Sequence, residues 1–291
     1  MYDYKDIRNF YFENEIGKRV DCQNINGGLF LYNVTGLGYE KNIEYQQVGN
    51  SFIKDDEKIV QNRITGELEF YNMTYDEYKT FINFILNSIS LRLIYIPKTS
   101  KRVEYYRDVD MCKIDKSEED DYNVLTSPIE INCKSLWYEE NIATYNIVPE
   151  DDEVRWDFEW DSTFEDYNSQ SIEYKNEGHV EAPILLEIEG PASNPVIEIY
   201  IDNKLYQRVT LKTQIQAYEK ILYNSKENEF RIQKVHTDGT TESMFNLDVL
   251  DFPNEDPVIR LPKNYDCEIR IKADDVIQKA KLTILPQYFA V

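Results

Sequence analysis

Aromatic and acidic side chains alternate along residues 156–161, in the order Trp-Asp-Phe-Glu-Trp-Asp. Aromatic rings beside carboxylates are residue types that bind sugars, and two carboxylates across a cleft are what a glycoside hydrolase requires. A strand through this segment would place its rings on one face and its carboxylates on the other. The simpler interpretation is therefore a buried aromatic face with a wet acidic face. Sugar binding through Trp156 and Trp160 is the functional alternative, and hydrolysis is the weakest hypothesis.

The rest of the chain offers little for catalysis or for cofactor binding. His179 and His236 are the only histidines, they lie near no G-x-S-x-G motif, and we interpret both as exposed loop residues. The acidic runs 118–121 and 150–153 lack the Asp-x-Asp-x-Asp-Gly order of a calcium loop, and the glycines form no phosphate-binding loop. We expect no enzymatic activity, no cofactor and no metal site.

Composition narrows the class of protein further. The chain has 54 acidic and 32 basic residues, a net charge of −22, which argues against binding to a nucleic-acid backbone and favours a well-solvated surface. The four cysteines, at positions 22, 112, 133 and 267, are too far apart to indicate zinc or a disulfide framework, so we expect reduced thiols in strands. The first residues do not resemble a signal peptide, and no apolar run approaches a membrane span. These features predict synthesis in the cytosol and no membrane partner.

The sharpest pattern of secondary structure lies at residues 66–97. Residues 67–71 alternate as a strand, and Thr74 and Glu77 then form a capping box that predicts a helix over 75–89. The apolar residues of this helix recur at spacings of three and four, which predicts that one face lies on a core. That face comprises Tyr78, Phe81, Ile82, Ile85, Leu86 and Ile89. Residues 91–96 return to strand-type residues and end at Pro97.

Strands and turns dominate the remainder. The Asn-Gly-Gly signal in 22–31 predicts a hairpin, a strand is expected through Tyr45, and residues 46–63 are interpreted as a long loop or an extended arm. Strands at 103–111 and 124–133 close the first domain, and the acidic segment 139–153 is the linker candidate. At 291 residues the chain is long enough for two domains, which we place at 1–140 and 141–291.

The second half predicts a β-sandwich, because short strands follow one another at regular spacing with turn residues between them. The expected turns are at 202–204 and 236–241. The expected strands are Ile184–Glu189, Val196–Asp202, Leu205–Leu211, Lys220–Tyr223, Phe230–Val235, Met244–Val249, Val258–Leu261, Glu268–Lys272 and Lys281–Leu285.

Several of these segments together resemble a known family. The strand–helix–strand unit followed by LIYIP (93–97), a tyrosine-rich strand, an acidic loop and SLWYEE (135–140) resembles the N-terminal half of the distal tail proteins of long-tailed bacteriophages. The N-E-G at 176–178, A-P-I at 182–184 and E-G-P at 189–191 are similar to the opening of the family's C-terminal domain. The segment 263–266 departs from the pattern, since relatives often have a glycine-x-asparagine turn there.

The resemblance implies a structural function without catalysis. It implies an α+β, split-barrel-like N-terminal domain that forms a ring, hexameric in the family, and a galectin-like C-terminal β-sandwich. The implied partners are further copies of the chain, the tail tube protein, the tail tip or hub protein and a receptor-binding protein. An arm-like loop in the region of residues 46–63 would reach a neighbouring subunit. The location would be the tail of a phage, prophage or tail-like particle, assembled in the bacterial host cytoplasm. The alternative is a non-catalytic, carbohydrate-binding two-domain protein.

Overall fold

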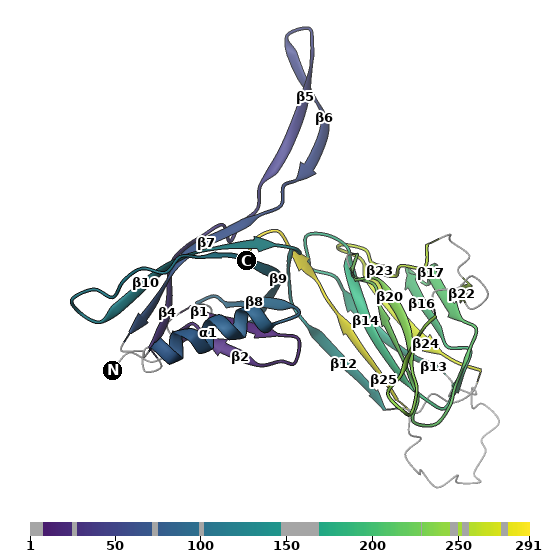
Figure 1. The fold of residues 1–291 in the computed structure, drawn as a ribbon. Coiled ribbons are helices and arrows are strands. Elements are labelled where there is room, and N and C mark those ends of the chain that lie inside the picture. The colour runs from purple at the N-terminus through teal and green to yellow at the C-terminus, as the bar shows by residue number, and fades with distance from the viewer. Residues whose placement is uncertain are drawn as a thin grey trace, which may run out of the picture. The chain divides into compact units, whose positions relative to one another are not determined.

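The structure is a computed structural model that describes residues 8–24, 28–71, 75–98, 102–146, 169–227, 229–244, 250–251, 256–274 and 279–291 (Figure 1). Over these residues the protein is mainly β with one helix, α1 (Tyr75–Asn87), which confirms the predicted fold class. The chain divides into two compact units. Unit 1 is Met1–Glu139 with Tyr288–Val291, and unit 2 is Glu140–Gln287.

Unit 1 is built on one antiparallel sheet with the strand order β2-β1-β8-β9-β10-β7-β4-β3, and β11 and β26 pair beside this path. The Asn-Gly-Gly hairpin is confirmed by the pairing of β3 with β4. The strands are β1 (Asn9–Asn14), β2 (Arg19–Asp21), β3 (Gln23–Asn24), β4 (Leu29–Thr35), β7 (Arg63–Tyr71), β8 (Leu91–Ile96), β9 (Tyr105–Ile114), β10 (Val124–Cys133), β11 (Trp137–Tyr138) and β26 (Gln287–Tyr288).

Helix α1 packs on this sheet through Phe81, Phe84 and Ile85. The ring of Phe81 lies 5.6 Å from that of Phe70 on β7, centroid to centroid. The predicted core face is wrong at Leu86 and Ile89, which are 75% and 90% exposed. Leu86 is rotated by about 100° from Ile85, away from the sheet. Ile89 lies beyond the end of the helix, which stops at Asn87 instead of residue 89. Thr74 of the predicted capping box is outside the described residues.

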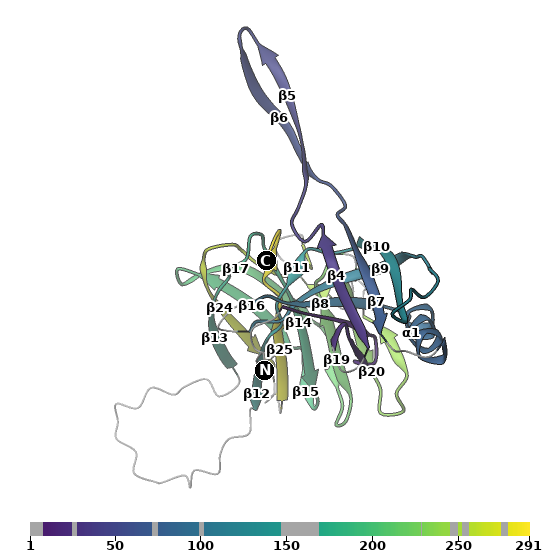
Figure 2. The same cartoon turned by 90° about the vertical axis from the view of Figure 1, so that its left-hand side faces the viewer.

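An antiparallel hairpin extends away from the sheet of unit 1 (Figures 1 and 2). It consists of β5 (Lys41–Val48) and β6 (Ser51–Ile59), which pair only with each other. Of the two interpretations of residues 46–63, the long loop is therefore wrong and the extended arm is confirmed. We call residues 41–59 the arm.

Unit 2 contains two larger sheets that share one hydrophobic core. Ile184, Leu186 and Ile221 of one sheet and Ile197 and Ile269 of the other belong to this core. The first sheet has β12 (Asn141–Asn146), β25 (Lys279–Ile284), β14 (Ala182–Glu189), β19 (Lys220–Asn224), β20 (Arg231–Val235), β21 (Thr241–Ser243) and β23 (Arg260–Leu261). The second has β13 (Ser169–Lys175), β24 (Asp266–Lys272), β16 (Val196–Ile201), β17 (Lys204–Leu211) and β22 (Leu250–Asp251). The short strands β15 (Ala192–Ser193) and β18 (Gln214–Ile215) form a separate pair.

Most predicted strands of unit 2 are present, with several differences. The linker prediction is wrong at 141–146, because these residues form β12 and pair along β25. Strands β13, β15, β18, β21 and β22 were not predicted. The strand expected at 244–249 is not seen at Met244, and residues 245–249 lie outside the described part of the chain. The turn at Asp202 and Asn203 is confirmed, with φ of 50° and 60° at the two residues.

Candidate functional site

The residues that suggested chemistry lie only partly within the described structure. Trp156, Trp160 and the acidic run 150–153 lie outside the described residues. His179 is an exposed loop residue, as predicted. His236 is half-buried, because its Nδ1 atom lies 2.8 Å from the carboxylate of Glu219, so its predicted exposure is wrong. Over the described ranges, no group of three or more His, Cys, Asp or Glu residues is arranged to bind a metal.

Glu219 organises a small polar cluster in unit 2. Its carboxylate accepts a hydrogen bond from the backbone amide of Gln216 and pairs with Lys234 Nζ, each at 2.8 Å. These bonds, that of Lys234 first, lower the pKa of Glu219 to about 2. The cluster fastens the β18–β19 loop to strand β20, which is a structural role.

Helix α1, the single helix in the described ranges, is too short and too polar to span a bilayer.

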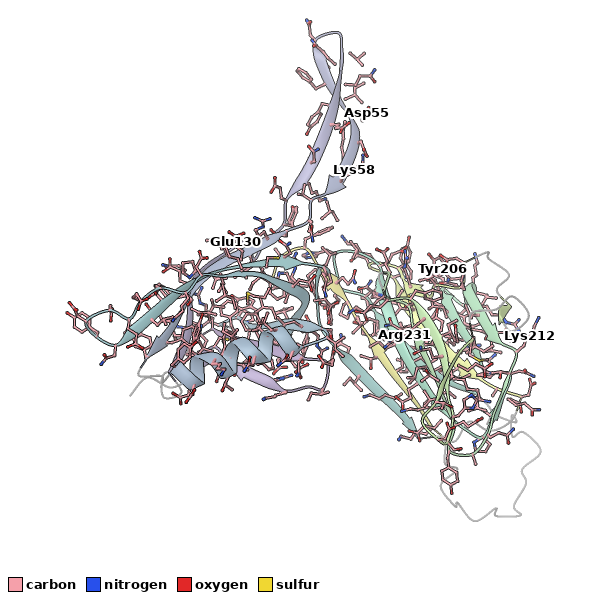
Figure 3. All side chains as sticks on the ribbon, in the orientation of Figure 1. Asp55, Lys58, Glu130, Tyr206, Lys212 and Arg231 are labelled. Atoms are coloured by element: carbon pink, nitrogen blue, oxygen red, sulfur yellow. The ribbon has the colours of Figure 1, made fainter. Side chains whose placement is uncertain are left out.

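The side chains of the arm are unusual for a surface hairpin (Figure 3). Tyr45 is 59% exposed and Phe52 is 69% exposed, and Ile43, Val48, Ile53 and Ile59 are exposed as well. A two-stranded hairpin without a third strand is marginally stable in water, and exposed apolar clusters mark interaction sites. The arm is therefore the strongest candidate for a functional surface among the described residues.

A β-bulge decides which side chains share a face of the arm. Glu44 pairs with Asp56 and Tyr45 pairs with Lys54, which leaves Asp55 without a partner across the hairpin (Figure 3). The bulge shifts the alternation of β6 by one residue. It thereby places Phe52 and Lys54 on the face that carries Tyr45 and Ile43. Glu57 on this face pairs with both Lys41 and Lys54, so the charges beside the apolar residues are largely neutralised within the arm.

The root of the arm is held tightly to the sheet. The side-chain amide of Asn62 donates to the carbonyl oxygens of Gly36 and Gly38, each at 2.6 Å. The indole Nε1 of buried Trp137 donates to the carbonyl of Leu37 at 2.9 Å. Gly36 has φ of +82°, and a Cβ there would lie 2.1 Å from the carbonyl oxygen of Arg63, so only glycine fits. The direction of the arm is thus set by unit 1 itself.

A second exposed apolar group lies at the end of helix α1. The Glu15 carboxylate, in the β1–β2 turn, accepts hydrogen bonds from the backbone amides of Ile89 at 3.0 Å and Ser90 at 3.3 Å. These bonds bring Ile16, which is 79% exposed, to the same region as Leu86 and Ile89. We call Ile16, Leu86 and Ile89 the helix-end patch.

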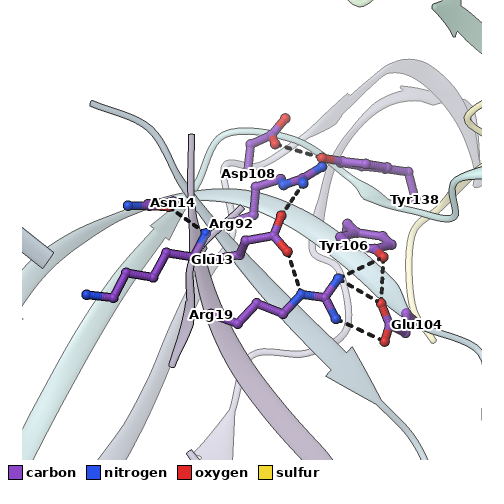
Figure 4. A network of polar contacts seen from close by, with 9 residues as sticks. Glu13, Asn14, Arg19, Arg92, Glu104, Tyr106, Asp108 and Tyr138 are labelled. Atoms are coloured by element: carbon purple, nitrogen blue, oxygen red, sulfur yellow. Dashed lines mark hydrogen bonds and ion pairs between the residues drawn. The ribbon is translucent and has the colours of Figure 1, made fainter. Parts of the chain in front are cut away.

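The strands around this patch are joined by a network of polar contacts (Figure 4). Glu13 of β1 is buried and pairs with Arg19 of β2 and Arg92 of β8. The two Nη atoms of Arg19 donate hydrogen bonds to the carboxylate of Glu104, each at 3.1 Å. The hydroxyl of Tyr106 on β9 donates to the same carboxylate at 2.6 Å. This network fixes the β1–β2 edge of the sheet, and sequence spacing gives no sign of it because its members come from separate strands.

Comparisons with known proteins agree with this architecture. Residues 9–134 match the family model described as distal tail protein, N-terminal domain. No curated protein matches the chain in sequence. Among solved structures, a chain of the phage p2 baseplate in its activated conformation, with Sr or with Ca, has a TM-score of 0.67 and 18% identity, over 98% of this chain and 100% of that chain. The SPP1 Dit protein, described as a paradigm of the hub adsorption apparatus in phages that infect Gram-positive bacteria, has a TM-score of 0.53 and 10% identity, over 95% and 98% of the two chains.

The two kinds of similarity carry different weight. The solved structures show that the fold is shared over nearly the whole chain, while the family model identifies the N-terminal part by its sequence. The resemblance predicted from the segments at 66–97 and 135–140 is thereby confirmed. The sequence match is to the distal tail protein, N-terminal domain, and it covers residues 9–134 of this chain.

Proposed function

We propose that the protein is a structural ring component of a phage tail or tail-like particle. Unit 1 associates side by side with further copies of the chain in a closed ring, hexameric as in the family. The ring joins the tail tube to the tip or baseplate, and unit 2 carries the receptor-binding components. The distal tail protein domain at 9–134 and the whole-chain similarity to the baseplate chain and to SPP1 Dit support this function.

The arm is the observation that carries the proposal. Strands of eight and nine residues reach about 30 Å from their root, well beyond the sheet that holds them. The apolar side chains at the far end, Tyr45 and Phe52 among them, are exposed and need a partner outside their own unit. A second copy of the chain supplies that partner in a ring.

The charge of the chain agrees with a structural role rather than with phosphate binding. With a net charge of −22, the protein has no excess of Lys and Arg to displace counterions from nucleic acid. Copies of so acidic a chain repel one another unless they meet through surfaces with little charge. The arm meets this requirement, since its residues 45–53 include no ionised side chain.

The mass of the purified protein in solution tests the ring. We expect light scattering over a wide concentration range to show a multiple of the monomer mass, and electron microscopy to show closed rings. The variant Tyr45→Ser/Phe52→Ser is expected to be monomeric. Its matched control is Tyr122→Ser/Tyr218→Ser, which removes two aromatic rings that are exposed elsewhere. Rings that persist in the arm variant would contradict the role of the arm.

Carbohydrate binding is the other function to be tested. It rests on Trp156 and Trp160, which lie outside the described residues, and no described residue adds to it. The third tryptophan, Trp137, is fully buried. A shift of tryptophan fluorescence when cell-wall glycan is added, lost in Trp156→Phe/Trp160→Phe, would support glycan binding. Tryptophans that a soluble quencher cannot reach would count against it.

A further inference from the structure

The arm and the helix-end patch lie at opposite edges of the same sheet. The arm connects β4 to β7, and these strands lie toward one end of the strand order β2-β1-β8-β9-β10-β7-β4-β3. The helix-end patch includes Ile16 of the β1–β2 turn, and β1 and β2 form the other end of that order. Both features belong to unit 1, and Figure 1 shows the arm leaving the sheet away from helix α1.

Both surfaces contain long uncharged stretches, although Lys54 lies on the face of Tyr45 and Phe52, and Lys18 Nζ lies 5.9 Å from the ring of Phe84 on helix α1. Residues 80–91, which include the end of α1 and the loop after it, contain no ionised side chain. Residues 45–53 at the far end of the arm contain none either, although 30% of all residues are charged. The carboxylate of Glu15, which precedes Ile16 in the chain, accepts hydrogen bonds from the amides of Ile89 and Ser90. Two copies can therefore bring these uncharged stretches together with little like-charge repulsion.

The other exposed apolar residues of unit 1 do not share this property. Tyr75 and Tyr122 are exposed, but acidic side chains lie next to them in sequence, at 76–77 and 118–121. The hydroxyl of exposed Tyr71 donates to the carboxylate of Glu69. Tyr39 lies against the ring of Phe289, at 5.1 Å between centroids. The arm end and the helix-end patch are thus the best-matched pair of apolar surfaces that the described part of unit 1 offers.

A closed ring requires two different surfaces on each subunit, because each copy contacts its two neighbours with different faces. We propose that the far end of the arm, residues 45–53 of one copy, docks on Ile16, Leu86 and Ile89 of the next copy. The inference rests on the ring function proposed above and identifies the receiving surface. Tyr45 and Phe52 are the anchors, and the exposed aliphatic side chains of the patch receive them. The positions of Leu86 and Ile89, apolar yet outside the core, follow from this role.

A disulfide trap tests the pairing directly. Cys112 is exposed and is replaced by serine, whereas Cys22, Cys133 and Cys267 are buried. Burial also raises the pKa of the Cys267 thiol to about 11 and raises the pKa of Cys133, so these native thiols react slowly. In this background we introduce Phe52→Cys in one sample and Leu86→Cys in a second sample that carries a size tag. Mild oxidation of the mixture is expected to give a heterodimer as the main product.

Two controls define the outcome. Tyr218→Cys, exposed in unit 2, replaces Leu86→Cys and is expected to abolish the heterodimer with Phe52→Cys. A chain with both Phe52→Cys and Leu86→Cys is expected to give a ladder of cross-linked species that stops at one largest size. Absence of the heterodimer, while wild-type protein still forms rings, would overturn the pairing and leave the ring intact. A heterodimer with a ladder that grows without limit would support the pairing and overturn the closed ring.

Mixing of surface variants gives an independent readout without cross-linking. Tyr45→Ser/Phe52→Ser removes the arm surface, and Leu86→Ser/Ile89→Ser removes the patch. Each variant alone is expected to be a monomer, and their mixture is expected to form a 1:1 dimer that grows no further, because one complete interface remains per pair. The matched control for the patch is Ile142→Ser/Leu205→Ser, with two exposed aliphatic residues of unit 2. Rings formed by the patch variant would overturn the proposal.

Discussion

The carboxylate of Glu15 lies 3.0 Å from the backbone amide nitrogen of Ile89 and accepts its hydrogen bond. The bond joins the β1–β2 turn to the loop that follows helix α1 and holds the helix-end patch together. We expect Glu15→Ala to release this loop and to weaken assembly at a given concentration while the circular dichroism spectrum stays unchanged. Glu15→Gln keeps one acceptor oxygen and is expected to assemble better than the alanine variant. Equal assembly of the two variants in light scattering would contradict the anchoring role.

Gly36 controls the root of the arm. Alanine at this position would place a Cβ 2.1 Å from the Arg63 carbonyl oxygen, at a backbone φ of +82°. We expect Gly36→Ala to lower the free energy of unfolding by more than about 2 kcal/mol, because both a clash and backbone strain are introduced. Gly49→Ala is the control, since Gly49 has φ of +62° but open space around it. We expect Gly49→Ala to lower the free energy of unfolding by about 1 kcal/mol. Thermal unfolding of both variants would measure the difference.

Deletion of Asp55 tests the bulge of the arm. Without the extra residue the ladder becomes regular: Tyr45 still pairs with Lys54 and Phe52 keeps its face, while the local bend and twist that the bulge adds to the arm are lost. We expect weaker assembly, because the far end of the arm points in a different direction, with the thermal midpoint of the monomer little changed. Asp55→Asn, which keeps the bulge, is expected to assemble like the wild type. The same defect in both variants would show that the Asp55 side chain, and not the bend of the arm, is what assembly requires.

Glu13 is the buried carboxylate of the network in Figure 4. Its removal leaves Arg19 and Arg92 without their shared partner, so Glu13→Ala is expected to reduce the free energy of unfolding by about 3 kcal/mol. Glu104→Ala breaks a partly exposed pair with Arg19 and is expected to cost less than about 1 kcal/mol. Urea denaturation of the two variants measures these free energies of unfolding. Equal decreases in the two variants would contradict the idea that burial makes the ion pairs of Glu13 more important for stability than that of Glu104.

The low pKa of Glu219 predicts a pH dependence of stability. The folded state holds this carboxylate ionised down to about pH 2, whereas its ordinary pKa is 4.5. Its contribution is therefore complete above pH 4.5 and is lost as the pH falls toward 2. We expect the stability difference between wild type and Glu219→Gln to shrink over this interval in urea denaturation. Glu242→Gln, at an exposed carboxylate 3.4 Å from His236, controls for the loss of a charge beside the histidine.

Local patterns in the sequence were sufficient for much of the fold. The strands on both sides of helix α1, the hairpin turn at Asp202 and Asn203, and most strands of unit 2 follow from alternation and turn residues. Strand β12 was mistaken for a linker because it is a polar segment whose assignment depends on pairing with β25, far away in sequence. Such long-range pairing leaves no local signal.

The candidate site was harder to predict, because it consists of what the fold leaves uncovered. Leu86 and Ile89 have the spacing of core residues, and only the end of the helix at Asn87 and the bond to Glu15 show that they face outward. The register shift at Asp55 likewise depends on the pairing of two polar strands. The absence of charge in residues 80–91 and 45–53 was readable from the sequence and would have indicated both surfaces.

The return of the chain to unit 1 has a consequence for synthesis in the cell. Tyr288 and Val291 pack against the core of unit 1, and the ring of Tyr288 lies 5.7 Å from that of Tyr105. The ribosome makes these residues only after the whole of unit 2. A nascent chain that has emerged up to residue 139 therefore lacks part of the packing of unit 1. This order of events delays completion of the arm-bearing unit until unit 2 has been translated, and so limits association between unfinished chains on neighbouring ribosomes.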